Sequence, residues 1–188
     1  VELLSPASLA LVPQMAKPDV DQANGQFFKY FEIGDVTRAG AIVNYREELF
    51  EDLPSRGRLR VQANDVIFAK HRNSRGTALI VPPDFDGQIV TTGFMGIRPR
   101  DFDEALLLWS VFESEAFRTQ VYYLAVTAVQ AEIREDIFQK EFLLPVPADP
   151  DERKALIAKA REVHDLHVAT QQGLQGMRDF AAAVFQGK

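Results

Sequence analysis

The stretch that indicates the fold most clearly is Asp65-Val-Ile-Phe-Ala-Lys-His-Arg-Asn-Ser-Arg-Gly-Thr-Ala-Leu-Ile-Val81. Residues 66–69 and 78–81 are apolar and rich in residue types that favour strands, and two prolines follow the second run. The connecting segment 70–76 contains Lys, His, Arg, Asn, Ser and Gly, and no carboxylate. We therefore predict a β-hairpin whose connection presents cationic and amide side chains from a rigid base.

Other β-type segments lie on both sides of this hairpin. They are residues 27–33, 41–43, 58–62 and 88–92, with 94–98 expected to continue the last strand beyond a glycine break. Residues 44–57 are charged and end in Pro-Ser-Arg-Gly, which predicts a loop. Residues 1–26 show little periodicity and predict an irregular lead-in. A twisted, mostly β domain is expected between residues 27 and 148.

The hydrophobic period changes to a helical one at Asp101. Leu106, Trp109 and Phe112 recur at three-residue spacing behind Asp103, a residue type that caps helices. The helical pattern continues to about residue 125, and residues 142–147 form an extended run stiffened by two prolines. Helices that follow a set of strands place the chain in the α/β (α+β) class.

The last segment, residues 149–188, opens with a strong helix start signal. Asp149 stands at a cap position, Pro150 at the first helical position, and two acidic residues follow in the first turn. Apolar, small and polar residues then recur at alternating spacings of four and three, which is typical of a coiled coil. The residues of this seam are Leu156, Ala160, Val163, His167, Thr170, Leu174, Met177, Ala181 and Val184. We expect the seam to pack against a second helix, in another subunit or another copy; the alternative is an amphipathic helix packed on its own domain.

Composition limits the class of protein. The hydrophobic content of 46% is ordinary for a globular protein, and 188 residues suffice for a core. No apolar run approaches the ~20 residues that cross a bilayer, and no signal-peptide pattern opens the chain, so a cytoplasmic protein without membrane contact is expected. Because the sequence contains no Cys, disulfides, thiolate zinc sites and cysteine nucleophiles are excluded.

Motifs for catalysis are weak. The sequence has three histidines, of which His164 and His167 have a spacing that two metal ligands can use on a helix. No third ligand type stands nearby, so no metal site is expected. A nucleophile elbow and a dinucleotide-binding loop are also absent from the sequence. The sequence therefore predicts no cofactor and no chemistry of its own.

Basic residues gather locally on an acidic chain. The net charge is −6, which argues against a general nucleic-acid binder, yet residues 56–75 contain six Lys or Arg and the single carboxylate of Asp65. Arg forms bidentate contacts with phosphates and with guanine, and Asn does so with adenine. These residues favour a local basic face that contacts an anionic partner such as DNA; the alternative is an ordinary solvated loop.

The candidate DNA contacts fall into three groups. Arg72 and Arg75 are expected at base edges or phosphates, with Asn73 as an adenine reader and Ser74 beside it. Backbone contacts are expected from Lys70, Arg56, Arg58 and Arg60. The weaker candidates, which could equally be ordinary strand residues, are Thr91 and Thr92.

Several blocks, in order, resemble the target recognition domain of type I restriction–modification specificity subunits. The early blocks are Tyr30-Phe-Glu-Ile-Gly-Asp-Val-Thr-Arg-Ala-Gly-Ala-Ile42, Gln62-Ala-Asn-Asp-Val-Ile-Phe-Ala-Lys70, Arg75-Gly-Thr-Ala-Leu-Ile-Val81 and Ile89-Val-Thr-Thr-Gly-Phe-Met-Gly-Ile-Arg-Pro99. The late block is Tyr123-Leu-Ala-Val-Thr-Ala-Val-Gln-Ala-Glu-Ile133, followed by Phe142-Leu-Leu-Pro-Val-Pro147 and a helix opening. Asn64 replaces the usual Gly of the second block, and the late block lacks the usual Gly before its Gln.

The resemblance implies sequence-specific recognition of one half of a bipartite site, with catalysis in a methyltransferase or endonuclease partner. It also implies that the long helix sets the spacing and docks the methyltransferase subunit. One set of blocks is present, so the chain is expected to dimerise or to pair with a second specificity half. The alternatives are the recognition region of an adenine-N6 DNA methyltransferase polypeptide, or a protein-interaction module without a DNA role.

Overall fold

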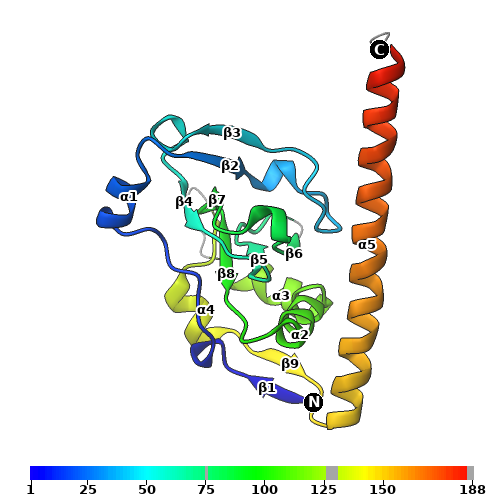
Figure 1. Cartoon of the computed structure of the whole chain (residues 1–188). Helices are drawn as coiled ribbons and strands as arrows, with labels where there is room; N and C mark the ends of the chain where they lie inside the picture. The colour runs from blue at the N-terminus through cyan, green and yellow to red at the C-terminus, as the bar shows by residue number, and fades with distance from the viewer. Residues whose placement is uncertain (75, 126–130, 186–188) are drawn as a thin grey trace.

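The computed structural model describes residues 1–74, 76–125 and 131–185 and shows a mixed α/β body with one long helix along its side (Figure 1). The strands are β1 (Glu2–Leu4), β2 (Phe27–Phe31), β3 (Arg46–Leu49), β4 (Gly57–Arg60), β5 (Val66–Ala69), β6 (Ala78–Ile80), β7 (Ile89–Thr91), β8 (Phe94–Ile97) and β9 (Leu144–Val146). The helices are α1 (Lys17–Ala23), α2 (Phe102–Phe112), α3 (Glu115–Leu124), α4 (Glu135–Glu141) and α5 (Pro150–Phe185).

Two sheets form the centre of the body. One has the order β3-β2-β7-β4 and the other the order β6-β5-β8, while β1 and β9 form a separate pair. β2 and β7 are parallel, with Tyr30 opposite Ile89, and the other pairs are antiparallel. The expectation that 94–98 continues the preceding strand is wrong, because Gly93 passes the chain from one sheet into the other.

The expected hairpin is present as β5 and β6, with Ile67 opposite Leu79. All four residues of β5 are buried, because its sheet is covered on both faces. Val66 and Phe68 pack toward the helices, and Ile67 and Ala69 pack toward the β3-β2-β7-β4 sheet. This double coverage explains why the strand is apolar throughout instead of alternating.

An ion pair between the buried Asp65 and the partly exposed Arg98 lies at the start of the hairpin. The Asp65 carboxylate, 1% exposed, accepts hydrogen bonds from Nε and Nη2 of Arg98, both at 2.9 Å, and from the backbone N–H of Gln62 at 2.7 Å. Between Gln62 and Asp65 the chain turns through Asn64, whose φ of 71° is a left-handed value that glycine adopts most easily. The glycine usual at this place in the resembled family has therefore been replaced by one of the few residues that tolerate the conformation.

The segment 44–57, expected as a loop, contains an additional strand, so that expectation is corrected. β3 pairs with β2 through Phe27 opposite Leu49, and a 3₁₀ turn over Phe50–Asp52 follows it. Charged residues are common on edge strands, where they discourage pairing with other chains, and β3 lies at the edge of its sheet. The expected strand 41–43 is reduced to a single bridge between Val36 and Ile42.

Capping residues define the helix starts. Asp101, rather than Asp103, caps α2, and its side chain accepts the N–H of Glu104 at 2.8 Å. Asp149 caps α5 as expected, because its Oδ1 accepts the N–H groups of Asp151 and Glu152 at 2.8 and 3.0 Å. In the part of the chain that the structure describes, no helix is long and apolar enough to cross a membrane.

Residues 1–26 contain elements that the sequence pattern did not indicate. β1 pairs with β9, and α1 packs Ala23 against Phe28 and neighbouring core residues of the β3-β2-β7-β4 sheet. The backbone N–H of Met15 bonds to the Arg58 carbonyl at 2.8 Å. This segment is therefore not irregular, although the division of the chain at residues 27 and 149 stays a prediction.

Candidate nucleic-acid interface

The connection that follows β5 is anchored to a distant segment of the chain. The N–H of Arg72 donates to the Ala131 carbonyl and the N–H of Ile133 donates to the Lys70 carbonyl, both at 2.9 Å. His71 and Glu132 form an antiparallel bridge between these bonds. The backbone of residues 70–72 is thus held in an extended form by residues 131–133, which gives the predicted recognition segment a rigid base.

Lys70 and His71 face a carboxylate across this bridge. The Nζ of Lys70 lies 3.5 Å and the Nε2 of His71 3.9 Å from Glu132 Oε2. Burial lowers the pKa of the His71 imidazole; the Glu132 carboxylate opposes this effect, and the charges of Arg56 and Lys70 add to it. Because Lys70 is largely buried and paired, it is a weaker phosphate contact than the sequence suggested.

Arg72 and Asn73 follow in the same segment, Arg72 half-buried and Asn73 exposed. The Arg72 guanidinium lies over the ring of Tyr122, with its Cζ 4.0 Å from the ring centroid. Asn73 is exposed, and its contact with DNA stays a prediction. The Ser74 hydroxyl turns inward and donates to the Ala69 and His71 carbonyls, so we assign it to the turn and not to DNA contact. Arg75 lies outside the described residues.

Arg58 and Arg60 belong to β4 and lie over aromatic rings of the 3₁₀ turn Phe50–Asp52 and of β2. The Arg58 guanidinium carbon is 4.7 Å from the Phe50 ring centroid, and that of Arg60 is 5.7 Å from the Phe28 centroid. Arg60 is exposed and its Nε donates to the Gly87 carbonyl at 3.1 Å. No carboxylate lies within 4.0 Å of either guanidinium among the residues described, so both keep their charge for a phosphate.

A shallow depression of about 150 Å³ lies where β2 and β7 end and β4 begins. Arg56, His71 and the acidic Glu32 are among its lining residues, whereas Arg58, Arg60 and Arg72 are not. Thr91 also lines the depression but is only 5% exposed. Its hydroxyl accepts a hydrogen bond from the N–H of Gly93 and also bonds to the Tyr30 hydroxyl. Burial raises the pKa of Tyr30. Thr91 therefore has an internal role, which corrects its assignment as a DNA contact. Thr92 is half-buried, and its N–H donates to the Arg56 carbonyl.

The long helix α5 has two distinct faces. Ile157, Ala160, His164, His167 and Gln171 are buried or half-buried against the body, mainly against α2. Ala160 and His167 of the predicted seam belong to this inner face, which corrects their assignment. The other seam residues lie about a quarter-turn away and, apart from the half-buried Leu156 and Ala181, are exposed: Val163, Thr170, Leu174, Met177 and Val184.

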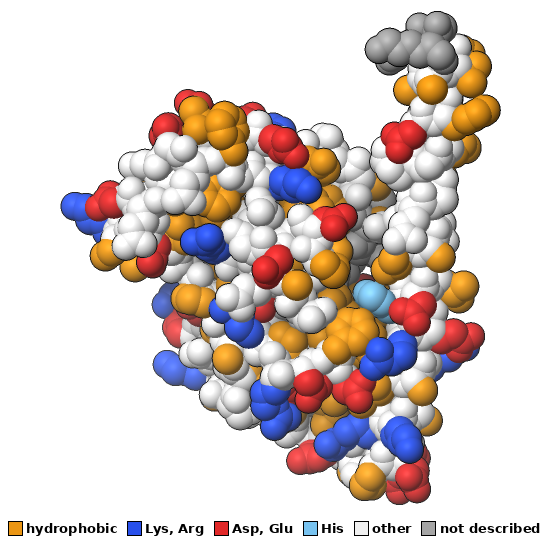
Figure 2. All heavy atoms as spheres, viewed as in Figure 1, with side chains coloured by type: hydrophobic (Ala, Val, Ile, Leu, Met, Phe, Trp, Pro, Cys, Tyr) orange, Lys and Arg blue, Asp and Glu red, His pale blue; other side chains and the backbone are white. Residues whose placement is uncertain are grey.

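The second half of α5 extends beyond the body, and hydrophobic side chains cover part of its surface (Figure 2). Leu174 is 46% exposed, Met177 60%, Phe180 72% and Val184 55%. Apolar side chains of this size, aligned along a projecting helix, are typical of a surface that is covered in an assembly. The inner face therefore docks on the body, while the outer face remains exposed in this chain.

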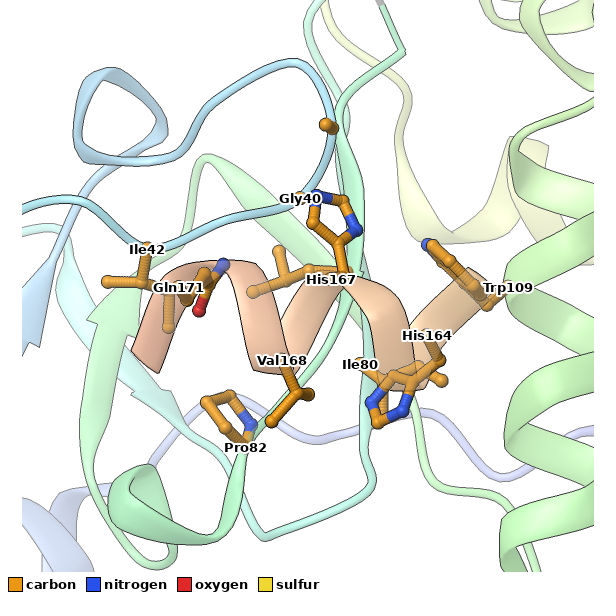
Figure 3. A pocket seen from close by; sticks show the side chains of 11 residues that line it. Gly40, Ile42, Ile80, Pro82, Trp109, His164, His167, Val168 and Gln171 are labelled. Atoms are coloured by element: carbon orange, nitrogen blue, oxygen red, sulfur yellow. The ribbon is translucent and has the colours of Figure 1, made fainter. Parts of the chain in front are cut away.

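The inner face of α5 encloses a small pocket of about 50 Å³. Figure 3 shows that His164, His167 and Gln171 of α5 line this pocket together with Trp109 of α2 and Ile80 of β6. The His164 ring packs edge-on against Phe102, with the centroids 5.3 Å apart. These histidines thus take part in helix packing, and the described residues contain no group of three or more His, Asp or Glu that could hold a metal.

The fold is shared with solved structures of type I restriction–modification proteins. The HsdS subunit from Thermoanaerobacter tengcongensis matches with a TM-score of 0.64 and 27% identity over 97% of this chain and 48% of that one. A chain from a structure on complex assembly and conformational transition of the type I R-M system matches with a TM-score of 0.67 and 27% identity, over 98% of this chain and 49% of that one. No family model and no curated protein matches the sequence.

These comparisons confirm the resemblance to type I specificity subunits and the mixed α/β fold with a long terminal helix. The chain spans about half the length of both solved chains. Sequence reasoning missed Tyr122 as a partner of Arg72, although Tyr122 and Tyr123 are adjacent tyrosines at the end of a helix that exposes both.

Proposed function

We propose that this chain recognises double-stranded DNA in a sequence-specific manner as a specificity component of a type I restriction–modification system. The observation that carries the proposal is the fold, which matches specificity-subunit structures across 97–98% of the chain at 27% identity. Methylation and cleavage are assigned to partner subunits, and no cofactor is assigned to this chain. A cytoplasmic location follows from these partners.

The recognition surface is proposed to be the segment 70–75 together with the edge of β4. Arg72 and Asn73 serve as base contacts, and Arg56, Arg58 and Arg60 as phosphate contacts. This assignment is supported by the exposure of Asn73 and Arg60 and by the rigid backbone of residues 70–72. The acidic remainder of the chain keeps non-specific affinity low.

Charge reversal of Arg72 should greatly weaken DNA binding. The Arg72→Glu variant replaces a bidentate donor by a repelling carboxylate, so its affinity should fall by roughly ten- to hundredfold. The measurement is fluorescence anisotropy on duplex pools over a salt series, with and without the methyltransferase subunit. The melting temperature should change little, because the Arg72 guanidinium forms no ion pair with a described carboxylate and lies over a ring that is itself half-exposed.

The matched control for Arg72→Glu is Lys154→Glu, which makes the same change in net charge at an exposed position early in α5. Both variants change the net charge equally, so an effect of general electrostatic steering would appear in both. Because Lys154 is not part of the proposed recognition surface, the affinity of Lys154→Glu should stay within about twofold of the wild type. Equal losses in both variants would assign the effect to net charge. No binding by the wild-type chain at low salt, with the partner present, would refute DNA recognition and leave the protein-interaction module.

We also propose that the outer face of α5 packs against an equivalent helix, in a second copy or a second specificity half. Support comes from the exposed apolar residues and from the match to only half of a specificity-subunit chain. Such a pair would place two recognition domains at a fixed distance on one duplex. The length of α5, 36 residues or roughly 54 Å, suits this role.

Replacing Leu174 and Met177 by Asp should abolish self-association while leaving the body folded. Both side chains are exposed, so the monomer loses no packing, whereas two carboxylates in an apolar helix interface remain unpaired. Gln172→Asp, which lies on the opposite side of the helix, is the control and should retain the dimer. Analytical ultracentrifugation gives the mass of each variant; a monomeric wild-type chain would restrict the proposal to a pairing with a different specificity half.

A further inference from the structure

A cation and two tyrosines meet on the surface beside the anchored segment 70–72. Tyr122 is 50% exposed and Tyr123 75% exposed, and their ring centroids lie 5.2 Å apart in an edge-on arrangement. The Arg72 guanidinium covers the Tyr122 ring at 4.0 Å, close enough for face-to-face stacking. Tyr122 comes from the last turn of α3 and Arg72 from the connection after β5, 50 positions earlier in the sequence.

Among the residues described, Arg72 has this ring as its one side-chain partner. The Glu132 carboxylate, on the segment that pairs with residues 70–72, lies beside Lys70 and His71 instead. A guanidinium stacked on a ring is fixed in orientation, while its N–H donors remain in the plane and available at the edge. The backbone of Arg72 is also fixed through the bond to Ala131. The arginine is therefore held at both ends without losing its hydrogen-bonding capacity.

Packing in the hydrophobic core does not explain the presence of Tyr122 at this place. A ring that stabilises the fold by burial is covered by its neighbours, whereas half of the Tyr122 surface remains exposed. The guanidinium groups of Arg58 and Arg60, in contrast, lie over the buried rings of Phe50 and Phe28. Tyr122 differs from these two rings because half of its surface remains exposed beneath the arginine.

We propose that Tyr122 is a positioning residue that holds Arg72 for bidentate contact with the O6 and N7 edge of a guanine. This inference rests on the proposed DNA-binding function and extends it to one base pair of the recognised half-site. Arg with two donors in one plane matches guanine in the major groove better than any other base edge. Tyr122 consequently determines selectivity at that base pair rather than affinity for DNA in general.

The test measures selectivity. Duplexes enriched from a randomised pool by the full wild-type chain identify the preferred sequence, and binding to every single-base-pair variant gives the preference at each position. Tyr122→Ala should reduce the preference for guanine at one position by roughly three- to tenfold and leave the other positions unchanged. Tyr122→Phe keeps the ring and should keep the preference. Tyr123→Ala, a matched control on the adjacent residue, should also keep it.

A second comparison separates positioning from a general effect on folding. In an Arg72→Ala background, Tyr122→Ala should cause no further loss of selectivity, since the residue acts through the arginine. A guanine preference that stays within twofold in Tyr122→Ala, or an equal weakening at all positions, would overturn the positioning role while leaving DNA recognition intact. Failure of the wild-type chain to enrich any duplex would overturn both the positioning role and the proposed function.

Discussion

The Phe68→Ala variant is expected to lose about 3–5 kcal/mol of folding free energy. Phe68 is fully buried at the centre of β5. Its ring centroid lies 4.9 Å from that of Phe112, 5.1 Å from that of Phe117 and 5.2 Å from that of Phe138, so one side chain joins the sheet to α2, α3 and α4. Truncation removes these contacts and leaves a cavity that three helices cannot close at once.

The Phe68→Ala substitution should also disturb the recognition surface. α3 carries Tyr122, and α4 follows the segment 131–133 that anchors the backbone of residues 70–72. Phe68→Ala should therefore weaken DNA binding even at temperatures at which the body is still folded. Phe68→Leu, which keeps most of the volume, should cost less than about 1.5 kcal/mol and preserve binding.

Chemical denaturation followed by circular dichroism measures both variants against a matched control. Phe27→Ala makes the same substitution in β2 at a side chain that is 71% exposed, and its free energy of unfolding should change by less than about 0.5 kcal/mol. Similar small losses for Phe68→Ala and Phe27→Ala would show that the ring cluster is not the core that unites sheet and helices.

The Arg98→Met variant is expected to lose about 2–4 kcal/mol of folding free energy. It leaves the Asp65 carboxylate, 1% exposed, with the N–H of Gln62 as its remaining donor. In the wild type, hydrogen bonding to Asp65 raises the pKa of the Arg98 guanidinium, and the pair joins the end of β8 to the start of β5. The Arg98 side chain is itself 35% exposed, so water moderates the cost compared with a fully buried pair.

Two further variants test whether the uncompensated charge of the buried Asp65 causes the loss of stability in Arg98→Met. Arg100→Met removes an ion pair with Glu104 whose arginine side chain is 86% exposed, and its free energy of unfolding should change far less than that of Arg98→Met. Replacing Asp65 by Asn in the Arg98→Met background removes the buried charge and should restore part of the lost stability. A double variant that is less stable than Arg98→Met alone would contradict this account.

Local sequence pattern was sufficient for the elements whose structure depends on their own residues. The hairpin of β5 and β6 follows from two apolar runs around a polar connection, and the start of α5 follows from Asp149 and the proline behind it. The order of the sequence blocks also indicated the specificity-subunit fold that the solved structures share. In each case neighbouring residues carry the information.

The sequence predicted only part of the candidate site. The cationic segment was found because its residues are contiguous, and Asn73 is indeed exposed. Thr91 and Ser74 were assigned to DNA by residue type, yet both hydroxyls bond within the protein. Tyr122 was not found, because nothing in the sequence shows that it lies under an arginine 50 positions away. Contacts between distant segments have no local signature.

By itself the sequence determined the mixed α/β composition, the central hairpin, the long terminal helix and the concentration of basic residues between 56 and 75. Tertiary structure decided which strands share a sheet, because the chain leaves one sheet at Gly93 and enters another. It also decided which side of α5 docks on α2 and which side stays exposed. The physical reason is that propensity and periodicity act between neighbouring residues, whereas sheet membership, helix docking and the Arg72–Tyr122 stack depend on free energies shared by segments that meet only in the folded chain.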